Sequence, residues 1–403
     1  MIDRIRKTTA GYSRPFWLLF WGTLIARSGS SMVWPFLTIY LRQRLQISLT
    51  EVAALLSINA AVSLIATSIA GPVIDRFGRK TPMVVGLAAS SLNLLAMSAA
   101  GSYSLWMLLM ALDGAISPLY QVGSQAMVAD LVEPERRPSA YALLRMIANL
   151  GVAIGPSVGG FITASSYALA FYIACAAEMA FAVLILLTVP ETVPAASPTP
   201  TSRREAGYGP VLRDRPFLGF CGVSVLAGMT YSLMMILLPV YAKENFGVPE
   251  NQYGFIMAAN AAMVVLLQYT TTRITSRHPH LPVLAAGSLF YAVGVGSVAW
   301  GWNFPTFLAS MVILTIGEMI MIPTSTALTA NLAPAEMRGR YMGIFGLTWS
   351  IGFGIGPVLG GYLNDTLAPA AIWHAGLVMG LAAALGFLLL ARVLRRPSLE
   401  PAA

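Results

Sequence analysis

The sequence has little charge, two cysteines and three histidines. Charged residues make up 10% of its 403 residues, whereas soluble domains carry roughly 25%. Hydrophobic residues make up 57%, and apolar runs of about 20 residues, the length that crosses a bilayer, recur along the chain. This composition excludes an ordinary soluble domain and predicts an all-α integral membrane protein embedded in a lipid bilayer.

The rarity of cysteine and histidine excludes several kinds of site. Cys175 and Cys221 both fall inside apolar runs, so neither a disulfide framework nor a Cys-x-x-Cys metal site is expected. His278, His280 and His374 fall at loops or span ends, and neither a phosphate-binding loop nor a Ser-His-Asp order is present. We therefore expect no enzyme, no metal and no cofactor.

Long apolar windows predict twelve membrane spans. They lie near 17–41, 50–72, 81–101, 104–129, 139–163, 167–189, 216–242, 251–273, 282–301, 305–330, 341–363 and 370–393. The first span is expected to be retained because no Ala-x-Ala type cleavage site ends it. Segment 190–215 is rich in Pro, Ser and Thr and reads as a linker. The predicted domains are six-helix bundles at 1–189 and 216–403, joined by this linker.

Basic residues predict the orientation of these spans. Of 25 Lys and Arg, 20 fall in the termini and in the loops on one side, three (Arg42, Arg44, Lys243) fall in the opposite loops, and two (Arg27, Arg145) fall within spans. Cytoplasmic loops carry the excess of Lys and Arg. We therefore expect both termini and the linker in the cytoplasm, which accounts for the net charge of +8 without a nucleic-acid partner.

An internal repeat relates the two halves. Residues 130–162 align with 331–363 at a constant offset of 201, without a gap. The matched residues are Gly151, Gly155, Pro156, Gly159 and Gly160 with Gly352, Gly356, Pro357, Gly360 and Gly361. Two pseudo-symmetric halves of the same orientation are typical of secondary transporters with a central cavity near mid-membrane. Glycines at four-residue spacing also predict close helix packing, and the prolines predict local bends.

Residues 71–80 form a charged turn between two apolar runs. They match the loop signature Gly-x-x-x-Asp-Arg-x-Gly-Arg-Lys at Gly71, Asp75, Arg76, Gly78, Arg79 and Lys80. Through this loop the whole chain resembles the major facilitator superfamily. Its Gly-Pro-x-x-Gly-Gly segment on span 5 resembles the motif of the twelve-span drug/proton antiporters. However, Met110 stands where those antiporters usually carry an arginine, four residues before Gly114.

The resemblance implies a role for the charged turn as a cytoplasmic gate. In relatives the aspartate that Asp75 matches caps a helix end in the opposite half. The following arginine, here Arg76, pairs with an acid at the foot of span 4, where this chain has Asp130. The alternative is a solvated turn that only follows the positive-inside rule.

Five charged residues within spans are candidates for proton coupling or substrate binding. They are Arg27 on span 1, Asp113 on span 4, Arg145 on span 5, Glu178 on span 6 and Glu318 on span 10. Two arginines neutralise two acids, so one acid is left to take up a proton or to contact a cationic substrate. The resemblance places Arg27, Asp113 and Glu318 at the central cavity. For Glu178, a structural pair with Arg145 or Arg27 is the alternative to a coupling role.

Further cavity candidates are polar, aromatic or methionine side chains: Trp34, Asn59, Tyr120, Gln121, Tyr231 and Met235, with Met229, Met234, Met319 and Met321 nearby. Methionine and aromatic surfaces suit variable apolar ligands. We therefore expect a monomeric plasma (inner) membrane transporter that uses alternating access and a proton gradient to export small apolar or cationic compounds. The alternatives are a transporter of one metabolite or sugar and, more remotely, a receptor on the same scaffold.

Overall fold

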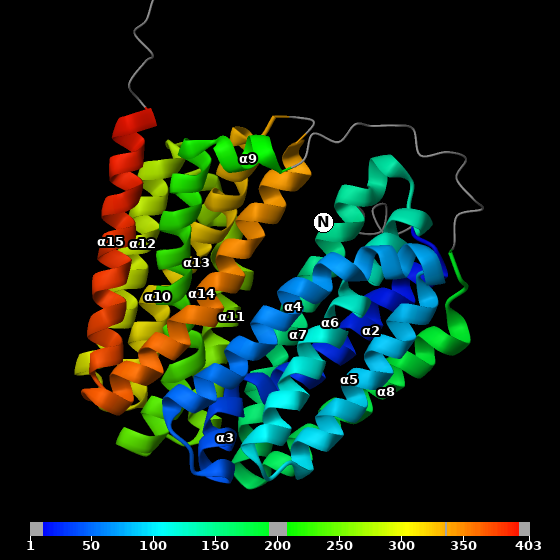
Figure 1. Ribbon diagram of the computed structural model, residues 1–403, viewed down its shortest axis with the longest axis horizontal. Coiled ribbons are helices and arrows are strands. Elements are labelled where there is room, and N and C mark those ends of the chain that lie inside the picture. Colours follow the sequence, from blue (N-terminus) through cyan, green and yellow to red (C-terminus); the bar gives the residue numbers. More distant parts are fainter. Residues whose placement is uncertain (1–10, 193–207, 335–336, 395–403) are drawn as a thin grey trace, which may run out of the picture. The chain divides into compact units, whose positions relative to one another are not determined.

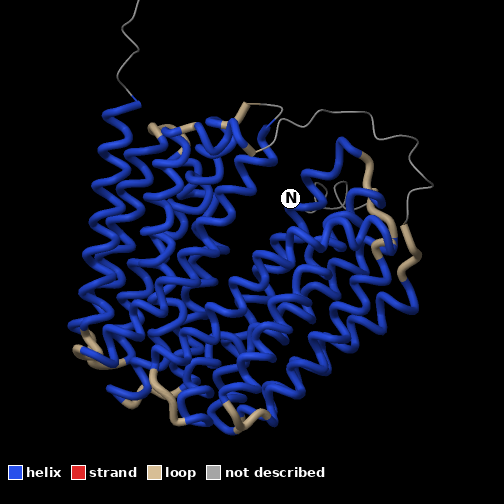
Figure 2. Tube along the Cα trace, viewed as in Figure 1, coloured by secondary structure: helices blue, strands red, loops and turns tan. Residues whose placement is uncertain are grey.

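The structure is a computed structural model that describes residues 11–192, 208–334 and 337–394. Within these ranges the chain is helical and the helices are joined by short loops (Figures 1 and 2). The first basic residues and most of the predicted linker, 193–207, lie outside the described residues. The predicted all-α, multi-span fold is confirmed.

The helices follow the predicted spans closely. In chain order they are α2 (Arg14–Val33), η1 (Trp34–Phe36), α3 (Leu37–Leu45), α4 (Leu49–Phe77), α5 (Lys80–Ala99), α6 (Tyr103–Leu131), η2 (Pro134–Arg136), α7 (Arg137–Ser165), α8 (Tyr167–Thr188), α9 (Gly209–Arg213), α10 (Arg215–Phe246), α11 (Glu250–Thr275), α12 (His280–Ser297), η3 (Val298–Trp300), α13 (Phe304–Leu332), α14 (Arg338–Thr366) and α15 (Ala371–Leu394). Eleven helical segments of the described chain are long and apolar enough to cross a membrane. The first predicted span is divided by η1, where Pro35 removes a backbone donor.

The chain forms two compact units. Unit 1 comprises residues 1–40 and 58–199. In it α2 packs against α7 and α8, and α5 packs against α6 and α8. Phe16, Leu19, Met83, Phe181 and Ile185 belong to its buried apolar core. Burial of these side chains positions the polar residues of α2, α5, α6 and α8 around a common space.

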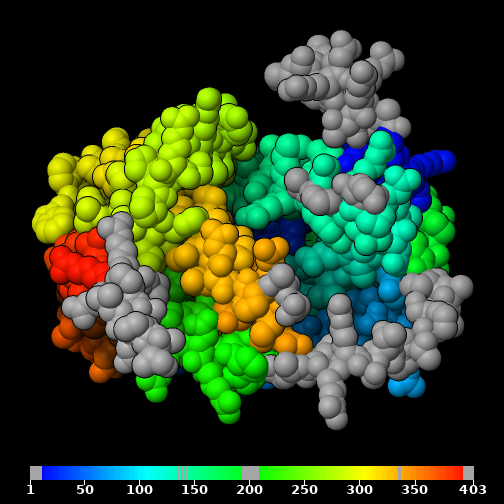
Figure 3. All heavy atoms as spheres, turned by 90° about the horizontal axis from the view of Figure 1, so that it is seen from above, coloured from blue at the N-terminus to red at the C-terminus, as the bar shows by residue number. Residues whose placement is uncertain are grey.

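Unit 2 comprises residues 41–57 and 200–403. In it α12 packs against α13 and α15, α10 packs against α14 and α15, and α11 packs against α13. Seen from above in Figure 3, the orange atoms of α14 reach the surface of this unit. Segment 41–57 packs with unit 2, although it falls within the first predicted bundle, 1–189.

Two polar contacts hold segment 41–57 within unit 2. The Arg42 guanidinium donates from Nε and Nη2 to the two carboxylate oxygens of Glu244, at 2.9 and 2.7 Å. This neighbour raises the pKa of Arg42 above its ordinary value. The Asp365 carboxylate accepts hydrogen bonds from the Thr50 amide at 2.8 Å and from the Thr50 hydroxyl at 2.6 Å. Asp365 thereby caps the N-terminus of α4.

The repeat found in the sequence recurs in hydrogen bonds inside each unit. In unit 1 the Ser31 hydroxyl donates to the Gly151 carbonyl at 3.1 Å. In unit 2 the Ser232 hydroxyl donates to the Gly352 carbonyl, also at 3.1 Å. Both residues of the second pair are 201 positions after those of the first. The two units therefore pack one helix pair, α2 with α7 and α10 with α14, in the same way.

The repeated glycines lie at these helix contacts. A Cβ atom on Gly155 would lie 2.7 Å from the Ser28 carbonyl oxygen, and one on Gly356 would lie 3.0 Å from the Met229 Cα atom. Both distances are shorter than the contacts that real Cβ atoms usually make. Small residues let membrane helices approach this closely, so these two glycines serve helix packing within their units.

Candidate functional site

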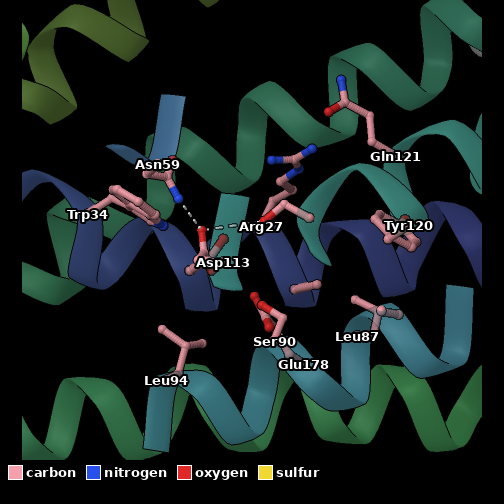
Figure 4. A pocket seen from close by; sticks show the side chains of 14 residues that line it. Arg27, Trp34, Asn59, Leu87, Ser90, Leu94, Asp113, Tyr120, Gln121 and Glu178 are labelled. Atoms are coloured by element: carbon pink, nitrogen blue, oxygen red, sulfur yellow. Dashed lines mark hydrogen bonds between the residues drawn. The ribbon is translucent and has the colours of Figure 1, made fainter. Parts of the chain in front are cut away.

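A cavity of about 240 Å³ lies within unit 1, among α2, α4, α5, α6 and α8 (Figure 4). Its lining includes Arg27, Trp34, Asn59, Ser90, Asp113, Ser117, Tyr120, Gln121 and Glu178. Three of the five predicted intramembrane charges and four of the six predicted cavity residues therefore lie around one space. We name this space the acid pocket.

Asp113 is held in the acid pocket by neutral donors. Its side chain is 7% exposed. The Asn59 amide donates to Asp113 Oδ2 at 2.9 Å, and the Ser117 hydroxyl donates to the same oxygen at 3.4 Å. The Asn59 amide also donates to the Met110 carbonyl at 3.1 Å, which fixes its orientation. These contacts position the carboxyl group but do not neutralise its charge.

Glu178 is the second carboxyl group of the acid pocket. It is also 7% exposed, and it lies beside Ser90 (Figure 4). Its Oε2 atom is buried without a hydrogen-bond partner within the described part of the chain. Among those residues no salt bridge joins Glu178 to Arg27 or Arg145, so the pair considered from the sequence is not formed in this structure.

A larger cavity of about 620 Å³ also lies within unit 1. It is lined by Thr23, Arg27, Tyr120, Gln121, Ser124, Gln125, Tyr141, Leu144 and Arg145, of which Leu144 alone lacks a polar group. Arg27, Tyr120 and Gln121 line both cavities. Arg145 thus lies at the larger cavity and is not among the lining residues of the acid pocket.

Unit 2 contains its own buried carboxyl group with a similar partner. The Asn260 amide donates to Glu318 Oε2 at 2.8 Å and to the Thr315 hydroxyl at 2.9 Å. Asn260 lies 201 positions after Asn59. The offset of the repeat predicts this residue, but α11 offered no other signal that singled it out.

The methionines expected along the cavity are mostly buried between helices of unit 2. Met229, Met234, Met319 and Met321 belong to its buried interior, and Met235 is partly buried. Their apolar side chains pack closely against neighbouring side chains in the interior. They therefore provide no support for an apolar substrate surface, which was the sequence argument for apolar compounds.

The charged turn of residues 71–80 forms a different ion pair from the expected one. Arg79 Nε donates to Asp130 Oδ2 at 2.9 Å, and Arg79 Nη1 lies 3.5 Å from Asp75 Oδ1. The Arg76 guanidinium instead lies 5.4 Å above the Phe77 ring. The left-handed backbone of Gly78, with φ of 86°, places Arg79 at the start of α5 within reach of Asp130 at the end of α6. Arg79 rather than Arg76 is therefore the ion-pair partner of Asp130 in this structure.

Glu191, just after α8, completes this turn. Its carboxylate accepts hydrogen bonds from the Arg79 amide at 2.7 Å and from the Lys80 amide at 3.2 Å, and so satisfies free donors at the start of α5. The neighbouring Thr192 hydroxyl donates to Asp130 Oδ2 at 3.1 Å. Among the described contacts of unit 1, Asp75 does not cap a helix end as Glu191 does, and its side chain is 74% exposed. No pattern in the sequence singled out Glu191, which follows the last apolar residues of span 6.

Comparison with known proteins identifies the family. The family model described as Major Facilitator Superfamily matches residues 19–234 and 220–403. An uncharacterized MFS-type transporter, YhjO of Bacillus subtilis, is 25% identical over 93% of this chain and 92% of its own length. A Na(+), Li(+), K(+)/H(+) antiporter of Planococcus maritimus is 27% identical over 81% of this chain and 84% of its own. The multidrug resistance protein MdtH of Aeromonas hydrophila is 25% identical over 99% of both chains.

A solved structure shares the fold. A POT family transporter in complex with a thioalcohol conjugated peptide matches with a TM-score of 0.79 and 16% identity, over 95% of this chain and 97% of its own. An identity this low shows the fold alone. Together with the family model, which covers both halves of the sequence, it leads to one conclusion. The chain belongs to the Major Facilitator Superfamily and is a multi-pass membrane transporter rather than an enzyme.

Proposed function

We propose that this transporter is a proton-coupled antiporter that exports small organic compounds, of the multidrug type, by alternating access. The observation that carries the proposal is the acid pocket. It holds two buried carboxyl groups, Asp113 and Glu178, but a single guanidinium, that of Arg27. With both acids ionised, the pocket has one negative charge in excess.

An uncompensated charge inside a membrane protein is costly and by default marks a functional site. The excess charge is removed when the pocket takes up one proton or when a cationic group enters it. A proton and a cationic substrate therefore compete for the same charge deficit. Such competition is the simplest physical basis for antiport, because each species is released when the other binds.

The names of the relatives support exchange and export. The Planococcus maritimus relative is a cation/proton antiporter, and MdtH is a multidrug resistance protein. Of the compounds expected from the sequence, the cationic class agrees with the charge of the acid pocket. The apolar class has lost its support, because the methionines that suggested it pack between helices.

A second candidate function is transport of one polar solute, such as a metabolite or sugar. The polar lining of the 620 Å³ cavity in unit 1 favours it, since its volume falls within the roughly 300–1,000 Å³ of small-molecule sites. Such a transporter would move one solute rather than a series of organic cations.

We further propose that the protein lies in the plasma membrane as a monomer with both termini in the cytoplasm. The support is the distribution of basic residues, with 20 of 25 on the side of the termini and three on the other. On this orientation the ion pair of Arg79 and Asp130 lies at the cytoplasmic surface, where it belongs to the proposed gate.

The proposed function can be tested in lipid vesicles. The purified protein is reconstituted, a proton gradient is imposed, and uptake of lipophilic cations, sugars and amino acids is measured together with proton flux. We expect movement of the cations, accompanied by opposite proton flux. The variant Asp113→Asn should lose the proton flux, whereas Glu133→Gln, which removes an exposed acid outside the pocket, should retain it. Solute movement that is independent of the proton gradient in the native protein would refute coupling.

A further inference from the structure

The two cavities of unit 1 share lining residues but carry opposite excess charge. Arg27, Tyr120 and Gln121 line both the acid pocket and the larger cavity of about 620 Å³, which we name the arginine cavity. The acid pocket has two carboxyl groups and one guanidinium. The arginine cavity has two guanidiniums, those of Arg27 and Arg145, and its described lining residues include no carboxyl group. Since Arg27 already offsets one acid, the charge of Arg145 is left without a compensating acid.

Packing of α7 against α2 and α6 places Arg145 at this cavity. Arg145 follows Tyr141 by four residues, so both side chains lie on the same side of α7. The Tyr141 hydroxyl donates to the Gln125 carbonyl at 3.0 Å, which joins this side of α7 to α6. Further along α7, a Cβ atom added to Gly151 would lie 2.8 Å from the Arg27 Cβ atom. Contacts among the three helices therefore hold the two arginines of the cavity in place within unit 1.

The guanidinium of Arg145 has no acidic partner within the described residues. None of the salt bridges in that part of the chain includes Arg145 or Arg27. Arg145 lies eight residues after the first residue of α7, about 12 Å along the helix axis and inside the predicted span 139–163. A charge within a membrane span is costly unless a partner compensates it. The anionic group of a ligand would be such a partner.

Neutral hydrogen-bond donors of α6 lie beside the two guanidiniums. Gln121, Ser124 and Gln125 fall within about one helical turn, and all three line the arginine cavity. A glutamine side chain has two N–H donors, and both glutamines are exposed. Figure 4 shows the Arg27 guanidinium toward Gln121, on the opposite side of the acid pocket from the Glu178 carboxyl group. The arginine cavity is thus lined by charged and neutral donors, the chemistry that binds an anion.

We propose that Arg145, together with Arg27, binds the anionic group of a zwitterionic compound whose cationic group lies in the acid pocket. The inference rests on the proposed function and adds the class of substrate and the location of its second charge. A guanidinium binds a carboxylate through two parallel hydrogen bonds. Because the two cavities share lining residues, one molecule can span them. Its positive group competes with the proton in the acid pocket, and its negative group adds affinity that a simple cation lacks.

The test uses three probes that share one ring skeleton and differ in charge. They are the zwitterion para-(aminomethyl)benzoate, the cation para-(aminomethyl)benzamide and the anion para-(hydroxymethyl)benzoate. Dissociation constants for the purified full-length protein in detergent are measured by isothermal titration calorimetry at pH 7, where ammonium and carboxylate groups are both charged. We expect the zwitterion to bind about tenfold more tightly than either other probe, because it alone places a group of opposite charge in each cavity.

Three results of this comparison would overturn the inference. They are equal affinity for the zwitterion and the cation, equal affinity for the zwitterion and the anion, and no binding of the zwitterion. Equal affinity for the zwitterion and the anion would indicate an isolated anion site, such as one for a lipid headgroup.

Variants separate the two ends of the ligand. Arg145→Gln should raise the dissociation constant of the zwitterion about tenfold without raising that of the cation, whereas Asp113→Asn should raise both. Arg145→Lys, which keeps the charge but not the planar fork, should recover part of the affinity. The matched control Arg277→Gln removes an exposed arginine that lines neither cavity and should bind the zwitterion as the native protein does.

Two results with these variants would contradict the proposed site. One is an Arg145→Gln variant that folds and binds the zwitterion as tightly as the native protein. The other is an equal loss of affinity in Arg277→Gln, which would assign the effect to net charge. If Arg145→Gln does not fold, the comparison of the three probes on the native protein still decides.

Failure of this inference and failure of the proposed function give different results. If Arg145 governs zwitterion binding but vesicles show no proton-coupled movement, the anion site stands and the antiport proposal fails. If proton-coupled movement of cations depends on Asp113 but zwitterion affinity is unchanged by Arg145→Gln, antiport stands and the anion site is refuted.

Discussion

Replacing Gly155 with alanine tests whether helix contact in unit 1 depends on the repeated glycines. The added Cβ atom would lie 2.7 Å from the Ser28 carbonyl oxygen of α2 and would also collide with the Ser31 hydroxyl. Ordinary contacts begin at 3.4 Å, so α2 and α7 must separate by the difference, about 0.7 Å. The clash is with backbone, so no rotation of a side chain relieves it.

The separation has a second cost because it stretches the hydrogen bond from Ser31 to the Gly151 carbonyl, now 3.1 Å. Overpacking typically costs about 1–3 kcal/mol, and an interhelical hydrogen bond in a membrane protein contributes about 0.6 kcal/mol. A loss of roughly 2–3 kcal/mol corresponds to a fall in melting temperature of roughly 4–12 °C for a unit of this size.

The assay is thermal unfolding of detergent-purified protein, followed by the fraction that remains monodisperse after heating. The matched control is Gly354→Ala on α14, since a Cβ atom there meets nothing within 4 Å. Alanine favours helix more than glycine by about 1 kcal/mol, so this control should be neutral or slightly stabilising. The reasoning is refuted if Gly155→Ala unfolds at the native temperature or above it.

Two further predictions concern polar contacts at helix ends. Arg79→Gln should destabilise unit 1 more than Arg76→Gln, by about 1–2 kcal/mol, because Arg79 makes the 2.9 Å contact with Asp130. Thermal unfolding of the two variants checks this, and equal stability would show that the contact between Arg79 and Asp130 does not stabilise unit 1. Asp365→Ala should cost about 1 kcal/mol in the same assay, because Asp365 accepts from the Thr50 amide and hydroxyl. A melting temperature equal to that of the native protein would show that this cap does not contribute.

The sequence alone determined the class of the protein and the approximate positions of its long helices. Apolar runs of about 20 residues must be helical in lipid, because every backbone polar group has to be satisfied within its own segment. The offset of 201 also determined the equivalence of the halves, since it predicts that Ser31 and Ser232 contact Gly151 and Gly352 in the same way. These features depend on local hydrophobicity and on repetition, both of which can be read from one chain.

The tertiary structure alone decided which polar groups meet. Helical spacing places Asp113 and Glu178 on faces of their own spans, but the rotation and packing of α6 and α8 bring both to one pocket with Arg27. A one-residue turn at Gly78, with positive φ, selects Arg79 over Arg76 as the partner of Asp130. The methionines were buried rather than exposed because apolar side chains pack equally well between helices and along a cavity. Which of these places a side chain occupies depends on neighbours far away in the sequence, and no local pattern contains that information.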